Sequence, residues 1–372
     1  MKNLLLKLLT AFVFFTLLSG CSIKMLPDKW DLPPKAEDEI SIMHFNIENL
    51  FDTEDDPDRE DHAYLPAQLK KTPEHAKLCA SQTGYRYKEC MEMDYSESLI
   101  KKKMSNLAKI ILGVDNKGPD VLVLIEIENE KILKRFNEEF LKDANYQTAV
   151  LLEGWDRRGV DVALLSRLPL AGKATLHKPE VKDETGTLDT EATKTRGILD
   201  VPLALPNKET LHVIGAHLPS QANPTKEREQ ILKQIVNIIK NKGENAMVVA
   251  GGDFNITAEE EDSNKLFKKI ATPIVDVSHF VGCKKCPGSH NYRKRWSFLD
   301  VQLYSPALKS EGKGSYRYLT ETIDIIRYDD LHIERGKYPM RWSWEKKEGV
   351  SDHFPIYVRL KKRPTATEPS IK

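Results

Sequence analysis

The sequence has no excess of either charge, because 56 lysines and arginines balance 56 aspartates and glutamates among 372 residues. This balance argues against the broad basic surface of a protein whose main task is to coat nucleic acid, so any polyanion must be bound locally. Fixed-period repeats and low-complexity tracts are absent. With 40% hydrophobic residues, the chain has enough apolar material for an ordinary buried core, which excludes a disordered or collagen-like protein.

Long apolar runs are also scarce. The run from Leu8 to Leu18 follows a short basic segment and is too short to span a bilayer comfortably, so it predicts an export signal. Its end, Leu18-Ser19-Gly20-Cys21, resembles the lipobox of bacterial lipoproteins, in which the cysteine carries a lipid. A plain signal peptide, or a buried helix with an incidental cysteine, is the alternative. Ser22 is typical of lipoproteins in the outer membrane of a two-membrane bacterium, so we expect a lipid-anchored protein of the cell envelope.

Cysteines are few. Beyond Cys21 there are four, Cys79, Cys90, Cys283 and Cys286, an even number in a compartment that permits disulfides. We expect local pairing, Cys79 with Cys90 and Cys283 with Cys286. The Cys283-Lys-Lys-Cys286 spacing is also compatible with half of a zinc site, but a second such pair and paired histidines are missing.

The chain is expected to form one folded domain. We assign 1–20 to the signal peptide, 21–38 to a tether rich in proline and charge, 39–362 to the domain and 363–372 to a tail. Residues 52–95 lack sustained periodicity and predict a surface insertion. The acids at its start lack the glycine and the terminal glutamate of a calcium loop, which favours a solvated loop over a specific ion site.

Strand and helix patterns alternate along the domain. Continuous or alternating apolar runs predict strands, and apolar residues at helical spacing predict helices. Asn129 and Asn223 are expected to cap the second and third helices. The alternation indicates an α/β fold, and the strand-rich stretches indicate two sheets. The predicted strands are 40–47, 121–125, 148–152, 160–165, 198–203, 211–216, 247–250, 298–304 and 356–360, and the predicted helices begin near 96, 129 and 224.

Polar residues suited to phosphate chemistry stand where these strands end. In α/β proteins ligands collect at the carboxyl ends of strands, so these side chains are expected to converge on one cleft. Several carboxylates with an amide suit a hard cation such as Mg²⁺ or Mn²⁺, with Ca²⁺ as a further ion. Taken singly, each residue also has a structural explanation, such as a turn for GDFN or a cap for SDH. The residues are Asn46, Glu126, His217, Asp253, Asn255, Asp300, Asp352 and His353.

Together, these motifs resemble the endonuclease/exonuclease/phosphatase family, which includes deoxyribonuclease I, abasic-site endonucleases, inositol-polyphosphate phosphatases and neutral sphingomyelinases. PDVLVLIE, GGDFN and SDHFP occur in family order, and the matches run from Asn46 to Phe354. The resemblance implies a two-sheet β-sandwich flanked by helices, in four layers. It also implies a divalent metal bound chiefly by Glu126, with Asn46 and Asp352 close by.

The resemblance further implies roles in hydrolysis. Asp253 would orient or deprotonate the attacking water, Asn255 would hold the phosphate, and His353, oriented by Asp300, would bind or protonate a phosphate oxygen. His217 stands where deoxyribonuclease I also has histidine and abasic-site enzymes have tyrosine. An imidazole pair can also supply general acid and base near neutral pH, so Asp253 and His217 are competing candidates for the base.

The sequence departs from deoxyribonuclease I at Glu128, where that enzyme has an arginine that grips the DNA minor groove. A like charge there would weaken binding to duplex DNA. Arg157 and Arg158 are the nearest candidates for backbone contacts, although an exposed turn explains them equally well. The run Arg293–Arg295, between Tyr292 and Trp296, combines charge with stacking surface, but a solvated loop with Trp296 packed inward is slightly favoured.

We therefore expect a monomeric, metal-dependent phosphodiesterase without a protein partner, most specifically an endonuclease acting on DNA or RNA. The alternative is a phosphatase or phosphodiesterase acting on phosphoinositides or sphingomyelin, which the lipid tether favours. An apolar hairpin for entering lipid is not evident, and this argues against the alternative. A catalytically silent binding module is disfavoured, because every matched motif position holds a competent residue.

Overall fold

The computed structural model describes residues 32–364. The predicted signal peptide, the lipidation site Cys21 and most of the predicted tether and tail lie outside the described residues. In the described part of the chain, no helix is both long and apolar enough to cross a membrane.

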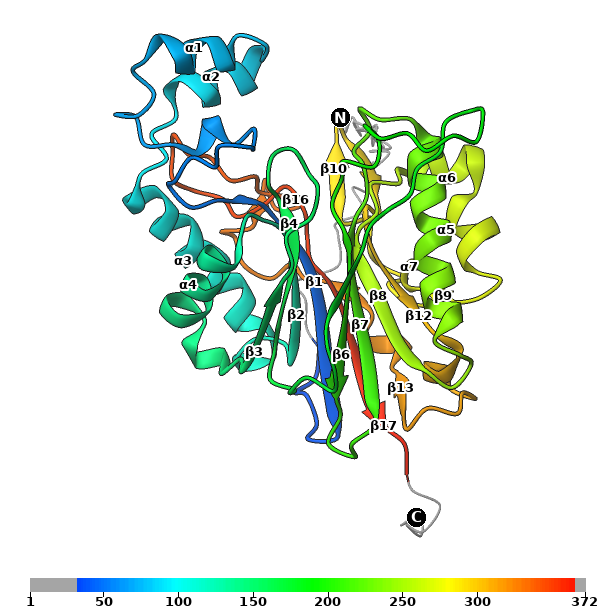
Figure 1. Ribbon diagram of the computed structural model, residues 1–372. Helices are drawn as coiled ribbons and strands as arrows, with labels where there is room; N and C mark the ends of the chain where they lie inside the picture. Colours follow the sequence, from blue (N-terminus) through cyan, green and yellow to red (C-terminus); the bar gives the residue numbers. More distant parts are fainter. Residues whose placement is uncertain (1–31, 365–372) are drawn as a thin grey trace, which may run out of the picture.

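Two mixed sheets form the centre of the molecule (Figure 1). The first has the strand order β13-β17-β1-β2-β4-β3, and β14 also pairs with β17. The second has the order β5-β6-β7-β8-β12-β9. Within these sheets β1 pairs with β2 and β7 pairs with β8 in parallel, whereas the other neighbours are antiparallel. The strands are β1 Glu39–Leu50, β2 Val121–Ile127, β3 Thr148–Leu151, β4 Asp161–Ser166, β5 Thr175–His177, β6 Ile198–Ala204, β7 Thr210–His217, β8 Met247–Asp253, β9 Asp276–Val277, β12 Asp300–Tyr304, β13 Tyr316–Tyr318, β14 Asp324–Ile325 and β17 Ile356–Lys362.

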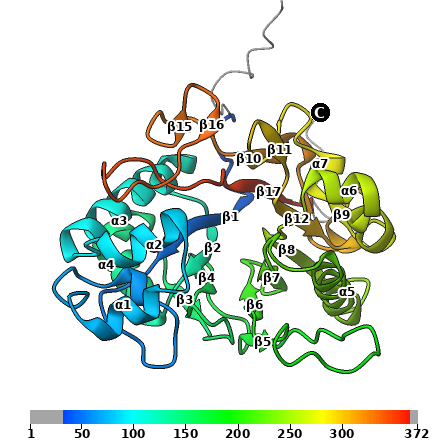
Figure 2. The ribbon, with the colours of Figure 1, turned by 90° about the horizontal axis from the view of Figure 1, so that it is seen from above.

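Helices cover the outer face of each sheet and complete a four-layer sandwich (Figure 2). α3 and α4 pack on the first sheet, and α5 packs on the second, with α6 and α7 on the same side. Their bounds are α3 Glu97–Gly113, α4 Glu130–Phe140, α5 Thr225–Asn241, α6 Ala258–Asn264 and α7 Ser278–Val281. The predicted α/β fold with two sheets flanked by helices is confirmed.

Strand periodicity explains the layers. Along β2, Leu122 and Leu124 pack against the helices, whereas Val121, Val123 and Ile125 pack against the second sheet. All five are fully buried, as expected for a continuous apolar run in a sheet covered on both faces. Burying each such side chain stabilises the fold by roughly 1.5–3 kcal/mol before entropy is counted.

One predicted helix cap is confirmed and one is wrong. The Asn129 side chain accepts a hydrogen bond from the Ile132 amide and begins α4. Asn223 does not cap α5, because that helix starts one residue later, after Pro224. The buried Arg228 guanidinium, in the first turn of α5, donates to the carbonyls of Pro219, Ser220 and Asn223. A side chain of the helix therefore stabilises the turn that precedes it.

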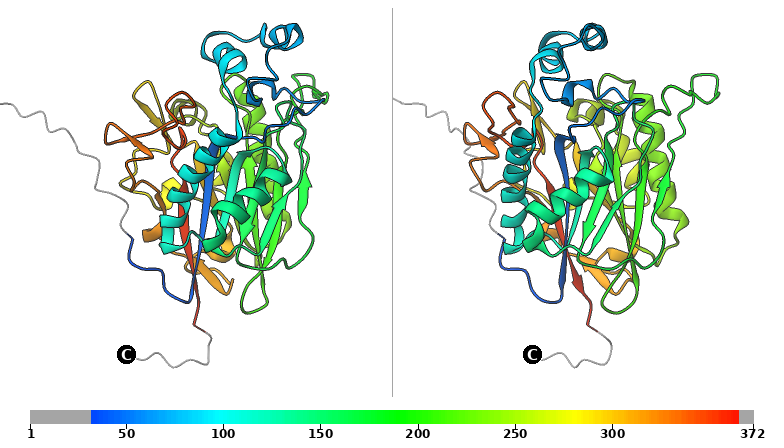
Figure 3. Two further views of the ribbon diagram at one scale, coloured as in Figure 1. Left: turned by 90° about the vertical axis from the view of Figure 1, so that its left-hand side faces the viewer. Right: turned by 60° about the vertical axis from the view of Figure 1, so that its left-hand side comes forward.

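The predicted insertion contains two short helices that stand beyond the end of β1 (Figure 3). They are α1 Pro73–Cys79 and α2 Gly84–Glu92, and the Cys79–Cys90 disulfide joins them. A second disulfide joins Cys283 and Cys286, so both local pairings are confirmed and the zinc alternative is not supported. Two hairpins lie outside the two main sheets, β10 His290–Tyr292 with β11 Arg295–Ser297 and β15 Ile333–Glu334 with β16 Tyr338–Pro339.

Candidate active site

Five of the predicted polar residues gather at one edge of the sandwich. Four stand where the two parallel strand pairs end, whereas Asp300 stands at the start of an antiparallel strand. Asn46 lies opposite Ile125 in the pairing of β1 with β2, one residue before Glu126. His217 lies opposite Asp253 in the pairing of β7 with β8. Asp300, the first residue of β12, lies opposite Asp253 on its other side. The strand register therefore brings residues far apart in the sequence to one place.

Asp253 is at the centre of this group. Its Oδ2 accepts a hydrogen bond from Asn46 Nδ2 at 3.1 Å, and this bond joins the two sheets. The same oxygen lies 3.6 Å from His217 Nε2 and 3.8 Å from His353 Nε2. Burial raises the pKa of Asp253 to about 7, although the positive charge of His353 opposes the shift. The carboxylate is thus held among polar partners with a pKa suited to proton transfer at neutral pH.

His353 forms a buried pair with Asp300. Its Nδ1 lies 2.7 Å from Asp300 Oδ2, and the Asp300 side chain is inaccessible to solvent. Burial alone would lower the pKa of His353, but the negative charges of Asp300 and Asp253 outweigh burial and raise that pKa well above 6.5. His353 is therefore a cation at neutral pH, and its Nε2 points toward Asp253.

His217 has the opposite electrostatic character. Burial lowers its pKa well below 6.5, and the positive charges of Arg196, Arg158 and His353 lower it further. Its Nε2 lies between two carboxylates, 3.6 Å from Asp253 Oδ2 and 3.8 Å from Glu126 Oε1. A neutral ring in this position is best satisfied with its proton on Nε2, directed at the carboxylates.

Glu126 fits the predicted role of metal ligand. It ends the apolar part of β2 with a left-handed backbone (φ 67°), a conformation that is uncommon outside glycine and that is often found at functional sites. Its nearest basic neighbours are the neutral His217, 3.8 Å away, and the cationic Arg158, 4.0 Å away. No hydrogen bond to its carboxylate occurs among the described residues. A partly buried carboxylate without close partners fits a site for a hard cation.

The segment that carries Asp352 packs against the end of β1 that carries Asn46. The Ser351 hydroxyl donates to the Asn46 carbonyl at 2.7 Å, which fixes the residue before Asp352 against the end of β1. Burial would raise the pKa of Asp352, but His353 and Arg341 outweigh it and lower the pKa. Asp352 pairs with Arg341 at 3.2 Å and is therefore an anionic carboxylate, as the predicted role of a metal ligand requires. Asn46 Oδ1 accepts from the Glu48 amide at 3.0 Å. The Asn46 side chain therefore links Asp253 to the end of β1.

Glu48 is a site residue that the sequence analysis missed. Its carboxylate pairs with Arg341 and accepts from the amides of Trp342 and Asp352, at 2.9 and 3.1 Å. Burial and the charge of Asp352 raise its pKa to about 8, against the opposing charges of Arg341 and Lys103. Its backbone is left-handed (φ 53°) and the strand pairing is irregular between Asn46 and Leu50, so strand periodicity in the sequence gives no signal for it.

Of the two arginines predicted to contact the substrate, only Arg158 lies at the site. Arg158 reaches the site, since its guanidinium donates to Asn49 Oδ1 at 3.2 Å and lies 4.0 Å from Glu126. Arg157 instead pairs with Glu191 at 3.2 Å on the exposed rim. It lines a polar cavity of about 200 Å³ together with the buried Arg196, which the sequence analysis did not identify.

Asn255 supports the turn after Asp253. Its amide N–H donates to Asp253 Oδ1 at 2.8 Å, and its side chain donates to the Leu218 carbonyl at 3.0 Å. The turn needs a left-handed residue, and Asn255 has φ 51°. Asn255 therefore joins the ends of β7 and β8, which carry His217 and Asp253.

The aromatic hairpin β10–β11 lies next to the site. His290 at its base lies against His353, with ring centroids 4.8 Å apart. Trp296 stacks on Tyr338 and Phe354, so it packs inward, as the solvated-loop interpretation of this segment predicted. Tyr292, in contrast, is 63% exposed. The Arg293 guanidinium covers the Tyr292 ring at 5.1 Å.

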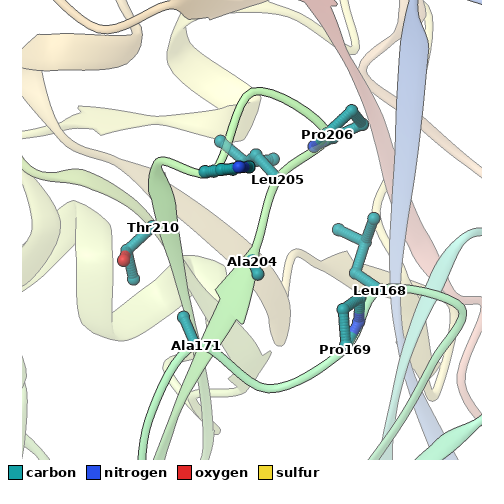
Figure 4. A pocket seen from close by; sticks show the side chains of 8 residues that line it. Leu168, Pro169, Ala171, Ala204, Leu205, Pro206 and Thr210 are labelled. Carbon is teal, nitrogen blue, oxygen red and sulfur yellow. The ribbon is translucent and has the colours of Figure 1, made fainter.

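A larger hollow than the polar cavity beside Arg157 lies elsewhere in the described structure. It has a volume of about 520 Å³ and lies where β6 turns into β7, at the opposite end of β7 from His217 (Figure 4). Leucine, proline and alanine dominate its lining, and Lys208 is its one titratable residue. It lacks the convergent polar groups of a catalytic site.

Comparisons with known proteins agree with this fold. A sequence profile described as the Endonuclease/Exonuclease/phosphatase family matches residues 83–362. Among solved structures, a humanized D. rerio TDP2 with 14 mutations is 14% identical, with a TM-score of 0.52 over 87% of this chain and 100% of that chain. An endonuclease/exonuclease/phosphatase family protein from Bacteroides thetaiotaomicron is 13% identical, with a TM-score of 0.50 over 88% of this chain and 98% of that chain. No curated protein matches the sequence. At these identities the structural likeness shows the fold alone.

Proposed function

The chain belongs to the endonuclease/exonuclease/phosphatase family, and we propose that it is a divalent-metal-dependent nuclease that hydrolyses phosphodiester bonds of DNA or RNA. The observation that carries this proposal is the placement of Asp253 between Asn46, His217 and the cationic His353. A carboxylate with a pKa of about 7 stands there beside a fixed positive charge. Proton removal from water and stabilisation of a phosphate oxygen are thus both within reach.

The site residues divide the chemistry. Glu126, with Asp352 and Asn46 close by, would hold the divalent ion, which when bound would oppose the negative charge that builds on the phosphate. Asp253 accepts the proton of the attacking water. His353 donates to a phosphate oxygen, and Asp300 keeps it protonated and oriented. Because the Nε2 proton of His217 is directed at Asp253 and Glu126, this histidine orients the carboxylates, which favours Asp253 over His217 as the base.

Cleavage of supercoiled plasmid by the purified full-length chain tests this function. With Mg²⁺ we expect nicking that EDTA abolishes. Asp253→Asn keeps the shape of the side chain but removes the base, so its rate should fall on the order of 10³-fold. Asp143→Asn is the matched control, because Asp143 is an exposed aspartate outside the site.

A parallel assay with single-stranded RNA covers the second substrate, and vesicles of phosphoinositide or sphingomyelin cover the alternative activity. The nuclease proposal fails if folded protein cuts neither DNA nor RNA with Mg²⁺ or Mn²⁺, or if Asp253→Asn cuts as fast as the wild type. Turnover of the lipid head groups alone would assign the alternative.

We also propose that the protein works at the cell envelope through a lipid on Cys21, which the lipobox-like segment supports. Expression of the full chain in a two-membrane bacterium with labelled palmitate provides the test. Wild-type protein should carry the label and sediment with the outer membrane, and Cys21→Ser should do neither. Equal membrane association of Cys21→Ser would refute the anchor.

A further inference from the structure

Four carboxylates gather where the insertion leaves β1. We call Asp52, Asp56, Asp61 and Glu128 the acidic cluster. The sequence favours a solvated loop here, but the structure buries most of the cluster: Asp61 is 1% exposed, Glu128 2% and Asp52 7%. Carboxylates are almost never buried to this degree unless they are paired or coordinate a cation.

The cluster is compact. One carboxylate oxygen from each of Asp56, Asp61 and Glu128 lies within 4.8 Å of the others. Glu128 Oε2 accepts from the Asp52 amide at 2.7 Å, and Asp61 Oδ2 accepts from the Asp56 amide at 3.0 Å. The chain thus folds around the carboxylates and holds them together despite their like charge.

The neighbouring cations do not balance this charge. Lys131 lies 3.7 Å from Asp52, but its side chain is 61% exposed and also pairs with Glu54. His62 lies 3.8 Å from Asp61 Oδ1. Arg59, inside the same segment, turns away and donates to the Asp156 carbonyl at 2.7 Å. No other basic side chain within 4.0 Å of the cluster occurs among residues 32–364.

Asp61 supplies a second, independent observation. Its Oδ1 is buried and has no hydrogen-bond partner in the described structure. A buried carboxylate oxygen without a partner normally has an ion or a water molecule beside it. Asp61 also belongs to two overlapping groups of potential ligands, one with Asp56 and Glu128 and one with Asp55 and His62.

We propose that the acidic cluster is a calcium site that fastens the insertion to the catalytic domain. The ligands are all oxygen, as a hard cation requires. Ca²⁺ takes about six to eight oxygen ligands in a flexible geometry and suits a group of several carboxylates, whereas Mg²⁺ usually keeps several waters and is bound by one or two carboxylates. This site is separate from the predicted catalytic ion at Glu126.

An ion bound at the acidic cluster would also affect the active site, because the cluster lies at the ends of the strands that carry Asn46 and Glu126. Glu128 follows Glu126 by two residues and precedes Asn129, the N-cap of α4. Asn129 also donates to Asp52 and Glu128, at 3.2 and 3.1 Å. A bound ion would therefore tie the ends of β1 and β2, which carry Asn46 and Glu126, to the start of the insertion.

Thermal unfolding of the full chain, followed by circular dichroism in EDTA and then with added Ca²⁺, tests the proposal. Free Ca²⁺ at about a hundred times its Kd should raise the Tm of the wild type by roughly 5 °C. Asp61→Asn should lose this rise. Asp143→Asn, the exposed control, and Glu126→Gln, which removes the predicted catalytic ligand, should keep it.

The EDTA measurement separates this role from a general loss of stability. Without the ion, Asp61→Asn should be at least as stable as the wild type, because an amide of the same shape relieves repulsion among the carboxylates. Glu128→Gln is the second variant if Asp61→Asn does not fold. The proposal is overturned if Ca²⁺ does not raise the Tm of the wild type, or if it raises the Tm of the cluster variants equally.

Discussion

Protonation of His44 should weaken the fold in mild acid. His44 is fully buried in β1, on the face that packs against the second sheet. Its Nε2 lies 3.3 Å from the Ile214 carbonyl, and its Nδ1 lies 3.0 Å from Gln302 Nε2. Gln302 Oε1 already accepts from the Tyr304 hydroxyl, which leaves the Gln302 amide as a donor toward the ring. A neutral ring with its proton on Nε2 satisfies both contacts, whereas a second proton on Nδ1 would face a donor.

The magnitude follows from linkage. Burial lowers the pKa of His44 from 6.5 to about 4. Because the folded pKa lies below the unfolded one, the stabilisation is complete above pH 6.5 and is lost as the pH falls toward 4, by about 3 kcal/mol in total. Between pH 7 and pH 5 the loss from this residue alone is about 2 kcal/mol.

Urea unfolding of the wild type and of His44→Gln, at pH 7 and pH 5 in EDTA, measures this contribution. The variant has no imidazole to protonate, so its loss of unfolding free energy between the two pH values should be about 2 kcal/mol smaller. Other buried histidines contribute equally to both proteins and cancel in the difference. Identical pH dependence in the two proteins would refute the assignment of a neutral, buried His44.

Three further predictions concern other parts of the molecule. Asp300→Asn removes the charge that raises the pKa of His353, so the alkaline limb of the pH–rate profile should move to lower pH and kcat should fall on the order of 10²-fold; an unmoved limb would contradict the pairing. Gly252→Ala places a Cβ 2.0 Å from the Ala216 carbonyl oxygen at a residue with φ 137°, and it should lower the free energy of unfolding in urea by about 3 kcal/mol or more. Gly243→Ala also has a positive φ, 93°, but has open space around it, and it should lower that free energy by about 1 kcal/mol. Cys79→Ser with Cys90→Ser opens a bridge of sequence separation 11 and should destabilise the insertion by roughly 2–3 kcal/mol; limited proteolysis should then cut between α1 and α2, and unchanged resistance would show that the bridge is dispensable.

The sequence predicted the parts of the molecule that local patterns determine. The apolar pattern of β1 and the continuous apolar run of β2 identified both strands, and the polar residue after each apolar run identified Asn46, Glu126, His217 and Asp253. The role of Asp300 was predicted only from the family resemblance, because an acid inside an apolar strand is equally well explained as a structural residue.

The remaining site residues depend on loops. Arg341 belongs to the segment between β16 and β17, and only the packing of that segment places its guanidinium on Glu48 and Asp352. Arg196 likewise lies in the segment before β6. Its ion pair with Asp156, at 3.1 Å, holds the guanidinium where its charge acts on His217. The acidic cluster is the strongest case, since its composition indicates solvation and only the fold of 52–61 against Glu128 buries it.

The inner layer of the sandwich explains why the chemistry occurs at this edge. Along β1 the residues that face the second sheet are Ile40, Ile42, His44 and Asn46, so the interior changes from apolar to polar toward the strand end. His44 is matched by Gln302 deep inside, and Asn46 is matched by Asp253 at the opening. A polar bond between two sheets stabilises little when it replaces hydration, but it fixes their relative position, because a displaced Asn46 would leave the buried Asp253 Oδ2 without its hydrogen bond. The same contact that aligns the sheets therefore holds the proposed base beside His353, and a shift of either sheet would disturb both.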